Sequence, residues 1–275
     1  MTQHDTLLAE PADLDRPPAT AARRRVALGR WQGVAAVAAF LLLWQLVSEL
    51  QLVDTFSLPP FTTVVAATYD LAKTGLLWSD IGISLLRAGC GFALALVVGI
   101  GVGLAIGWSR SASRWLSAPM EFFRQMPPLA MYPVFLLFLG LGLKSQIAMV
   151  FWGSVWPILL NTINGCQQVD DTLTKAARSY GVSRWQMFTK VVLPSAIPVI
   201  STGVRLGGTY ALLVLVGAEM IGAQNGIGFL ILNSQDTLEV PNMYSGILIL
   251  ACLGLILNFL LLRLERRITR WRLHA

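Results

Sequence analysis

The sequence has few charged residues, and the charges that it has are unevenly placed. Only 13% of the 275 residues are charged, whereas soluble proteins carry about a quarter. This deficit excludes an ordinary soluble domain and indicates that lipid surrounds much of the chain. The net charge of +6 does not indicate nucleic-acid binding, because most cations border apolar runs and no basic groove with aromatic partners can be assembled.

Cysteine and histidine are scarce as well. Cys90, Cys166 and Cys252 lie far apart in apolar sequence, and the two histidines lie near the termini. This pattern excludes a disulfide framework and a zinc site. The phosphate-binding pattern G-x-x-x-x-G-K-[ST] is absent, as are HExxH and the nucleophile elbow. The chain is therefore expected not to be an enzyme, and to bind no metal or cofactor itself.

Long apolar runs, in contrast, are abundant. Five uncharged stretches each approach the ~20 residues that a transmembrane helix needs. They lie between Arg30 and Glu49, Arg87 and Arg110, Arg124 and Lys144, Lys144 and Asp170, and Glu239 and Arg263. A sixth stretch, residues 191–221, is long enough but contains Arg205 and Glu219. The sequence therefore predicts an all-α polytopic membrane protein with six transmembrane helices.

The cations predict an orientation for these helices. If the six spans alternate, 17 Lys and Arg residues fall on the side of both termini, and Lys73, Arg87 and Lys144 fall on the other side. Cytoplasmic segments of membrane proteins carry the excess of basic residues. We therefore expect the N- and C-termini in the cytoplasm, and a multi-pass protein of the plasma (inner) membrane.

The same reading divides the chain into three parts. Residues 1–30 are predicted to be a disordered basic cytoplasmic tail, residues 31–266 the six-span domain, and residues 267–275 a second basic cytoplasmic tail. Between the first two spans, residues 54–80 fit either an interfacial helix on the outer face or an ordinary periplasmic loop.

Small residues recur at a fixed interval in the second span. Gly91, Gly99, Gly103 and Gly107, with Ala95 between the first two, are spaced in steps of four or eight residues. On a helix they form one smooth stripe that lets another backbone approach closely, as in membrane helix packing. We therefore expect these glycines to pack helices.

A basic loop interrupts the apolar sequence at "KAARSYGVSRWQMFTKVVLPSAIP", residues 175–198. A helix from about residue 171 to residue 180 is expected there, with Asp170 or Asp171 as its N-cap and Gly181 as its left-handed end. Ser183 is expected to cap a second short helix that runs to about Val191, before the chain re-enters the membrane.

The first of these helices presents Ala176 and Ala177 as a low bump. Such a bump fits a groove on another protein, and the flanking cations suit a partner with acidic rims. The alternative is a structured cytoplasmic loop whose cations only follow the rule that cytoplasmic segments carry the excess of positive charge.

This loop resembles the E-A-A-x3-G-x9-I-x-L-P loop of ABC-importer permeases. The pattern here reads Lys175-Ala176-Ala177, Gly181, Val191 and Leu193-Pro194, and every gap matches. Lys175 replaces the acidic residue of the family and Val191 replaces its isoleucine. The lost carboxylate removes any salt bridge that the family's glutamate would make.

The resemblance runs from about Trp31 to the C-terminus. It includes "SLLRAGCGFALALVVGIGVGLAIGWS", "EFFRQMPPLAMYPVFLLFLGLGLKSQI" and "GAEMIGAQNGIGFLILNSQDTLEVPNMYSGI". These stretches are most similar to permeases of aliphatic sulfonate, taurine and nitrate importers. The resemblance implies a type I ABC importer permease fold.

The resemblance also implies a function. The chain would be a permease subunit in an ATP-driven importer of a small organic anion, an aliphatic sulfonate or taurine. The implied partners are a second copy of the chain, two ABC ATPase subunits that bind ATP-Mg, and a periplasmic or lipid-anchored substrate-binding protein. The loop over about residues 170–194 would couple ATPase closure to alternating access. The residues expected to couple to the ATPase are Lys175, Ala176, Ala177, Arg178, Ser179, Gly181, Val191, Leu193 and Pro194.

Two ionisable residues of the fifth span are candidates for the translocation pathway or its gate. Arg205 and Glu219 are about 21 Å apart along one helix, so they cannot pair within it. Arg205 is expected either to meet an anionic headgroup or to clamp to a neighbouring carbonyl or helix end. Glu219 is expected near the outer gate or docking surface. Met131 is a pathway candidate with ordinary helix packing as its alternative.

Glu121 and Arg124 are expected to pair as i,i+3 neighbours on one helix. Two other classes of protein remain open. An ion-coupled secondary transporter would show inverted repeats, for which no half-to-half similarity is evident, and a membrane scaffold would only recruit a cytoplasmic partner. Within the resembled family, nitrate, bicarbonate and vitamin precursors remain alternative substrates.

Overall fold

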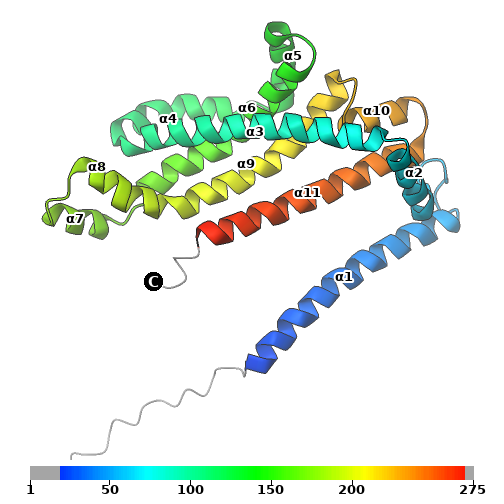
Figure 1. Ribbon diagram of the computed structural model, residues 1–275, viewed down its shortest axis with the longest axis horizontal. Helices are drawn as coiled ribbons and strands as arrows, with labels where there is room; N and C mark the ends of the chain where they lie inside the picture. Colours follow the sequence, from blue (N-terminus) through cyan, green and yellow to red (C-terminus); the bar gives the residue numbers. More distant parts are fainter. Residues whose placement is uncertain (1–18, 270–275) are drawn as a thin grey trace, which may run out of the picture. The chain divides into compact units, whose positions relative to one another are not determined.

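The computed structural model describes residues 19–269, and all regular secondary structure in this part of the chain is helical (Figure 1). The helices are α1 (Ala19–Glu49), α2 (Phe61–Lys73), α3 (Leu76–Trp108), α4 (Arg110–Gln125), α5 (Pro128–Leu139), α6 (Leu143–Gln167), α7 (Asp171–Ser179), α8 (Arg184–Gln186), the π-helix η1 (Met187–Val192), α9 (Leu193–Gly222), α10 (Ile227–Asp236) and α11 (Val240–Ile268).

The chain divides into two compact units, residues 1–62 and residues 63–275. In the first unit, the segment after α1 folds back on that helix. The indole N–H of Trp44 donates to the carbonyl of Pro59 at 3.0 Å, and the hydroxyl of Ser48 donates to the carbonyl of Leu58 at 2.7 Å. These bonds fix the turn that leads into α2.

α1 begins earlier than the sequence suggested. Residues 19–30, which were predicted to belong to a disordered tail, are helical. Alanine and arginine dominate this segment, and both are strong helix formers. Residues 1–18 of the predicted N-terminal tail and residues 270–275 of the predicted C-terminal tail lie outside the described residues.

Five helical runs among the described residues are long and apolar enough to cross a membrane. They are Gln32–Glu49 within α1, α3, α6, the continuous run Arg184–Gly222 and α11. α4 and α5 pass the same test only as a pair, and a bend of 92° separates them. The six predicted spans are therefore five long helices and one broken pair.

The broken pair corrects the predicted span between Arg124 and Lys144. α4 ends at Gln125, Met126 is extended, and α5 begins only at Pro128. The cause is Pro127-Pro128, because a proline pushes the preceding residue out of the helical region and cannot donate a backbone hydrogen bond. With 12 residues, α5 is about 18 Å long, too short to cross ~30 Å of hydrocarbon alone.

The second predicted span is longer than expected. α3 begins at Leu76 rather than near Arg87, so Arg87 lies inside the helix. Residues 54–80 contain the separate helix α2, in agreement with the helical alternative for this segment. Gly75, with φ of 80°, lies between α2 and α3.

α6 packs between α3 and α9, and small residues make this close approach feasible. The side chain of Thr162 lies where a Cβ on Gly103 would be, at 2.6 Å, and that of Cys166 lies 2.8 Å from a Cβ on Gly107. From the other side, a Cβ on Gly203 of α9 would lie 2.6 Å from Asn161. The predicted stripe on α3, Gly91, Gly99, Gly103 and Gly107, faces α6 along its whole length.

The second unit has two ends. Gly107 of α3 and Cys166 of α6 meet near α7, and we call this the α7 end. α10 packs against α9 and α11 at the other end, the α10 end (Figure 1). The hydroxyl of Ser245 on α11 also donates to the carbonyl of Val64 at 3.0 Å, which joins α2 to α11.

Replacing Gly103 with valine is expected to destabilise the protein by about 1–3 kcal/mol, because the new side chain overpacks the contact with Thr162 and the Leu159 carbonyl. Gly101→Val on the same helix is the matched control, since nothing lies within 4 Å of a Cβ there. Thermal unfolding of the detergent-solubilised protein compares the two. Equal unfolding temperatures for both variants would contradict the close packing of α3 on α6.

Candidate functional site

The first part of the candidate site is α7, which begins at a side-chain cap. The carboxylate of Asp170 accepts a hydrogen bond from the backbone N–H of Thr172 at 2.7 Å. This bond satisfies one of the free donors of the first helical turn. It also lowers the pKa of Asp170, because it stabilises the ionised carboxylate. Of the two predicted caps, Asp170 is the one that the structure uses.

The other end of α7 is fixed by a Schellman motif. The N–H of Val182 donates to the carbonyl of Ala177 at 3.3 Å, and the N–H of Gly181 donates to the carbonyl of Arg178 at 3.0 Å. Gly181 has φ of 70°, as predicted, and a Cβ at this position would meet no atom within 4 Å. The turn therefore requires glycine for its backbone conformation and not for space.

The helix after this turn differs from the prediction. Ser183 caps α8 in a capping box with Gln186, as the serine suggested. However, the helix does not stop near Val191, but continues through η1 into α9 without a break. The π-helical turn of η1 lies directly before Pro194, where the missing N–H of the proline interrupts the α-helical hydrogen-bond ladder. Residues Arg184–Gly222 thus form one helical body, about 58 Å long.

One face of this segment is anchored to the bundle. Cys166, Met187, Val192, Ala196 and Ile200 form a buried cluster, and Ala177, Val182 and Val191 pack against it. Two of the predicted coupling residues, Ala177 and Val191, therefore hold the loop in place.

The opposite face of α7 is exposed and partly apolar. Leu173, Ala176 and Tyr180 follow one another at intervals of three and four residues, so they share a face of the helix. Tyr180 is 88% exposed and Leu173 is 53% exposed. We call these three residues the α7 face. Large apolar side chains that a rigid, capped helix presents to solvent are typical of a protein docking surface.

A basic hollow of about 830 Å³ lies beside the α7 face. Four cations line it, from three different elements: Arg110, Lys175, Arg178 and Arg184. Asp171, which also lines the hollow, lies 3.7 Å from Arg110 in an exposed ion pair. Positive charge remains in excess, so the hollow favours an anionic group.

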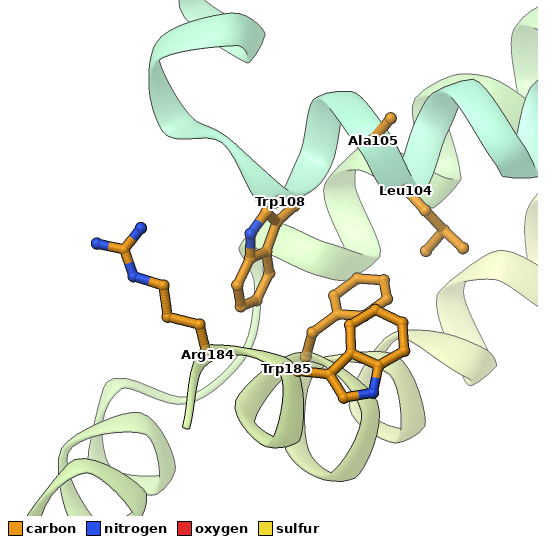
Figure 2. Close-up of a pocket in the computed structure, with 6 residues that line it drawn as sticks. Leu104, Ala105, Trp108, Arg184 and Trp185 are labelled. Carbon is orange, nitrogen blue, oxygen red and sulfur yellow. The ribbon is translucent and has the colours of Figure 1, made fainter. Parts of the chain in front are cut away.

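A second, apolar hollow of about 400 Å³ lies between the end of α3 and α8. Figure 2 shows Trp108 from α3 and Trp185 from α8 beside this hollow, with the guanidinium of Arg184 directed away from the rings. Phe188 contacts both indoles, with ring centroids 5.1 Å from Trp108 and 6.0 Å from Trp185. These aromatic contacts fix the start of the long helical body against α3.

Arg205 is paired with a neighbouring helix. Its Nε lies 3.1 Å from a carboxylate oxygen of Glu265 on α11, and Thr202 donates to the same carboxylate at 3.4 Å. Both charged side chains are about one-third exposed or less. Arg205 is therefore clamped near the end of α11, although its partner is a side-chain carboxylate and not the carbonyl of the clamp alternative.

Glu219 is fully buried and pairs with Arg87 of α3 at 2.7 Å. The hydroxyl of Ser84 and the backbone N–H of Gly228 also donate to its carboxylate. Arg87 in turn donates to the carbonyl and side chain of Asn225, in the loop between α9 and α10. The Arg87–Glu219 pair thus ties α3, α9 and the start of α10 together at the α10 end.

Sequence reasoning did not find the partners Arg87 and Glu265. A rule that ends an apolar run at the first charge makes Arg87 a boundary, although Leu85 and Leu86 before it and Ala88 after it are apolar. That uninterrupted apolar context was the available signal for a buried arginine. Met131 lies on α5, half-buried, beside the fully buried Tyr132.

The chain is similar to several known membrane proteins. Residues 95–271 match the family described as binding-protein-dependent transport system inner membrane component. The chain is 32% identical to an aliphatic sulfonates transport permease protein of Bacillus subtilis (strain 168), over 89% of this chain and 88% of that protein. It is also 32% identical to the taurine transport system permease protein of Escherichia coli (strain K12), over 86% and 88%.

Among solved structures, a chain of the inward facing MetNI methionine ABC transporter has a TM-score of 0.62 with 21% identity. The match covers 72% of this chain and 98% of that chain. The fold is therefore that of an ABC importer permease.

Replacement of either member of the Arg87–Glu219 pair with alanine is expected to destabilise the fold by about 3–5 kcal/mol, because the remaining charge stays buried without its partner. The double replacement is expected to cost less than the sum of the two single ones. A double-mutant cycle of thermal unfolding measures this coupling. Arg110→Ala, in an exposed ion pair, is the control and should change little. Additive effects at 87 and 219 would show that the two residues act independently.

Proposed function

Since the chain belongs to the family of binding-protein-dependent transport system inner membrane components, it is a permease subunit of an ABC importer, and we propose that its cargo is a small sulfonate anion. Relatives named for aliphatic sulfonates and for taurine support this class of cargo. A sulfonate is a compact monovalent anion, and the basic residues of the chain suit its charge.

We propose that the α7 end lies in the cytoplasm, together with both termini. The basic hollow with its four cations lies at this end, and an excess of positive charge marks the cytoplasmic side. Two ABC ATPase subunits would dock there, one on each copy of a permease homodimer, and would bind ATP-Mg. A substrate-binding protein, periplasmic or lipid-anchored, would dock at the α10 end.

The observation that carries the coupling role is the rigid link between the α7 face and α9. The cap at Asp170, the Schellman motif at Gly181 and the capping box at Ser183 leave little freedom in the loop. From Arg184 onward the chain is helical as far as Gly222. A displacement of α7 would therefore move the base of α9 with it.

In this proposal, closure of the ATPase dimer moves the two α7 faces. Each α9 follows, and the helices α3, α6 and α9 shift between an inward-open and an outward-open packing. Leu173, Ala176 and Tyr180 would sit in the groove of the ATPase. Lys175, Arg178 and Arg184 would contact acidic groups of the ATPase. Lys175 would pair with an acidic residue of the ATPase, although the family pattern has an acidic residue of the permease at this position.

Gly181→Val is expected to uncouple ATP hydrolysis from transport, because a β-branched residue resists a φ of 70°. Gly181→Asn is the matched control, since asparagine tolerates this conformation. Both side chains have room, so any difference reports on the backbone alone. ATP-driven ethanesulfonate uptake and ATPase activity are measured in proteoliposomes with the assembled transporter.

The valine variant should insert normally but lose at least about 90% of uptake, whereas the asparagine variant should keep most of it. Equal uptake by both variants would contradict a fixed coupling turn. Uptake by the permease alone, without an ATPase, would instead support the ion-coupled alternative.

A further inference from the structure

One charged pair of the bundle has no role in the site described above. Glu121 and Arg124, near the end of α4, form the ion pair expected from their spacing. The Nε of Arg124 donates to one carboxylate oxygen of Glu121 at 3.1 Å, and an Nη of Arg124 donates to the other. The side-chain amide of Gln125 donates to the same carboxylate at 3.0 Å.

This pair lies beside the middle of α6. Phe123, next to Arg124, stacks on Trp156 with ring centroids 6.2 Å apart, and meets Trp152 edge-on at 6.1 Å. Both tryptophans are at least nine residues from either end of α6, or about 14 Å. Arg124 therefore does not belong to the cation cluster at the α7 end, where the sequence had placed it.

α9 also places the bend away from the α7 end. Just beyond the bend, a Cβ on Gly217 would meet the side chain of Leu129 on α5, and Gly217 lies five residues from the end of α9. The break between α4 and α5 thus lies between the level of Trp156 on α6 and that of Gly217 on α9, away from the α7 end.

The pair is nevertheless accessible. Arg124 is 45% exposed and Glu121 is 53% exposed, whereas Arg87 and Glu219 are buried. An ionised side chain at the centre of a bilayer is costly unless it faces water or a partner. The exposed sides of Glu121 and Arg124 must therefore face an aqueous path or a second copy of the chain, and not lipid.

Arg124 has hydrogen-bond donors left for a ligand. A guanidinium has five N–H groups, and Glu121 takes two of those of Arg124. Because Arg124 is 45% exposed, its other donors can meet an oxyanion that approaches from the exposed side.

We propose that Arg124 is an anion-binding residue of the translocation pathway, and that Glu121 holds its guanidinium until a sulfonate group replaces the carboxylate. The planar guanidinium matches two oxygens of a sulfonate as it matches those of a carboxylate. Released Glu121 keeps its hydrogen bond from Gln125. The 92° bend between α4 and α5 opens the helix at this level, as broken helices do in other transporters.

This proposal rests on the sulfonate cargo proposed above, and the test separates the two. The assembled transporter, with its ATPase and substrate-binding protein, is reconstituted in proteoliposomes, and uptake of ethanesulfonate is measured. Arg124→Gln should lower the maximal uptake rate at least tenfold, while ATPase stimulation by the loaded binding protein stays within twofold. Arg124→Lys should restore part of the uptake, because the charge is kept although the planar fork is lost.

A second measurement does not depend on transport. With Cys90, Cys166 and Cys252 replaced by serine, Arg124→Cys should react with the water-soluble anion 2-sulfonatoethyl methanethiosulfonate. Val97→Cys, on a 74% exposed position of α3, is the control expected not to react.

The failures are distinguishable. If the wild-type transporter takes up no ethanesulfonate, the proposed cargo is wrong and the role of Arg124 falls with it. If the wild type transports ethanesulfonate and Arg124→Gln does so equally well, only the role of Arg124 is wrong. A residue 124 as unreactive as residue 97 would overturn that role as well.

Discussion

The close packing of α6 between α3 and α9 is the constraint on which the rest of the structure depends. Glycines bring the three backbones so near that side chains of α6 occupy the places where Cβ atoms of α3 and α9 would lie. Packing of this kind, rather than a hydrophobic effect, holds helices together in lipid. This packing fixes the positions of the three helices relative to one another. A force on one end of α9 therefore acts on α6 and α3 as well.

Charged residues also join the helices, through ion pairs. Arg87 pairs with Glu219 where three elements meet at the α10 end, and Arg205 pairs with Glu265 where α9 approaches α11. Both of the predicted pathway residues of the fifth span therefore hold helices together in the structure. The exposed pair of Glu121 and Arg124 differs from them in accessibility, and this difference makes it the better candidate for contact with a charged solute.

The sequence predicted what depends on local spacing. The turn at Gly181, the cap at Asp170, the i,i+3 pair at Glu121 and the small-residue stripe on α3 all follow from neighbours within one or two turns of a helix. It did not predict that Arg87 lies inside α3, because its partner Glu219 is 132 residues away. Nor did charge counting reveal that Pro127-Pro128 divides a span, since the rule that located the spans considers charge and length but not the backbone limits of proline.

α9 connects the two ends of the proposed mechanism. It continues from the capped loop at Ser183, pairs with α11 through Arg205, contacts Leu129 of α5 at Gly217 and ends in the buried network of Glu219. A helix without a break transmits displacement along its axis, whereas a broken one such as α4–α5 absorbs it at the bend. In our proposal a pull on α7 would therefore move α9, with α6 and α3 packed on it, relative to the bend at Pro127, and the surroundings of Arg124 would change. The solute site and the ATPase site would thus be coupled through one helix and would need no direct contact.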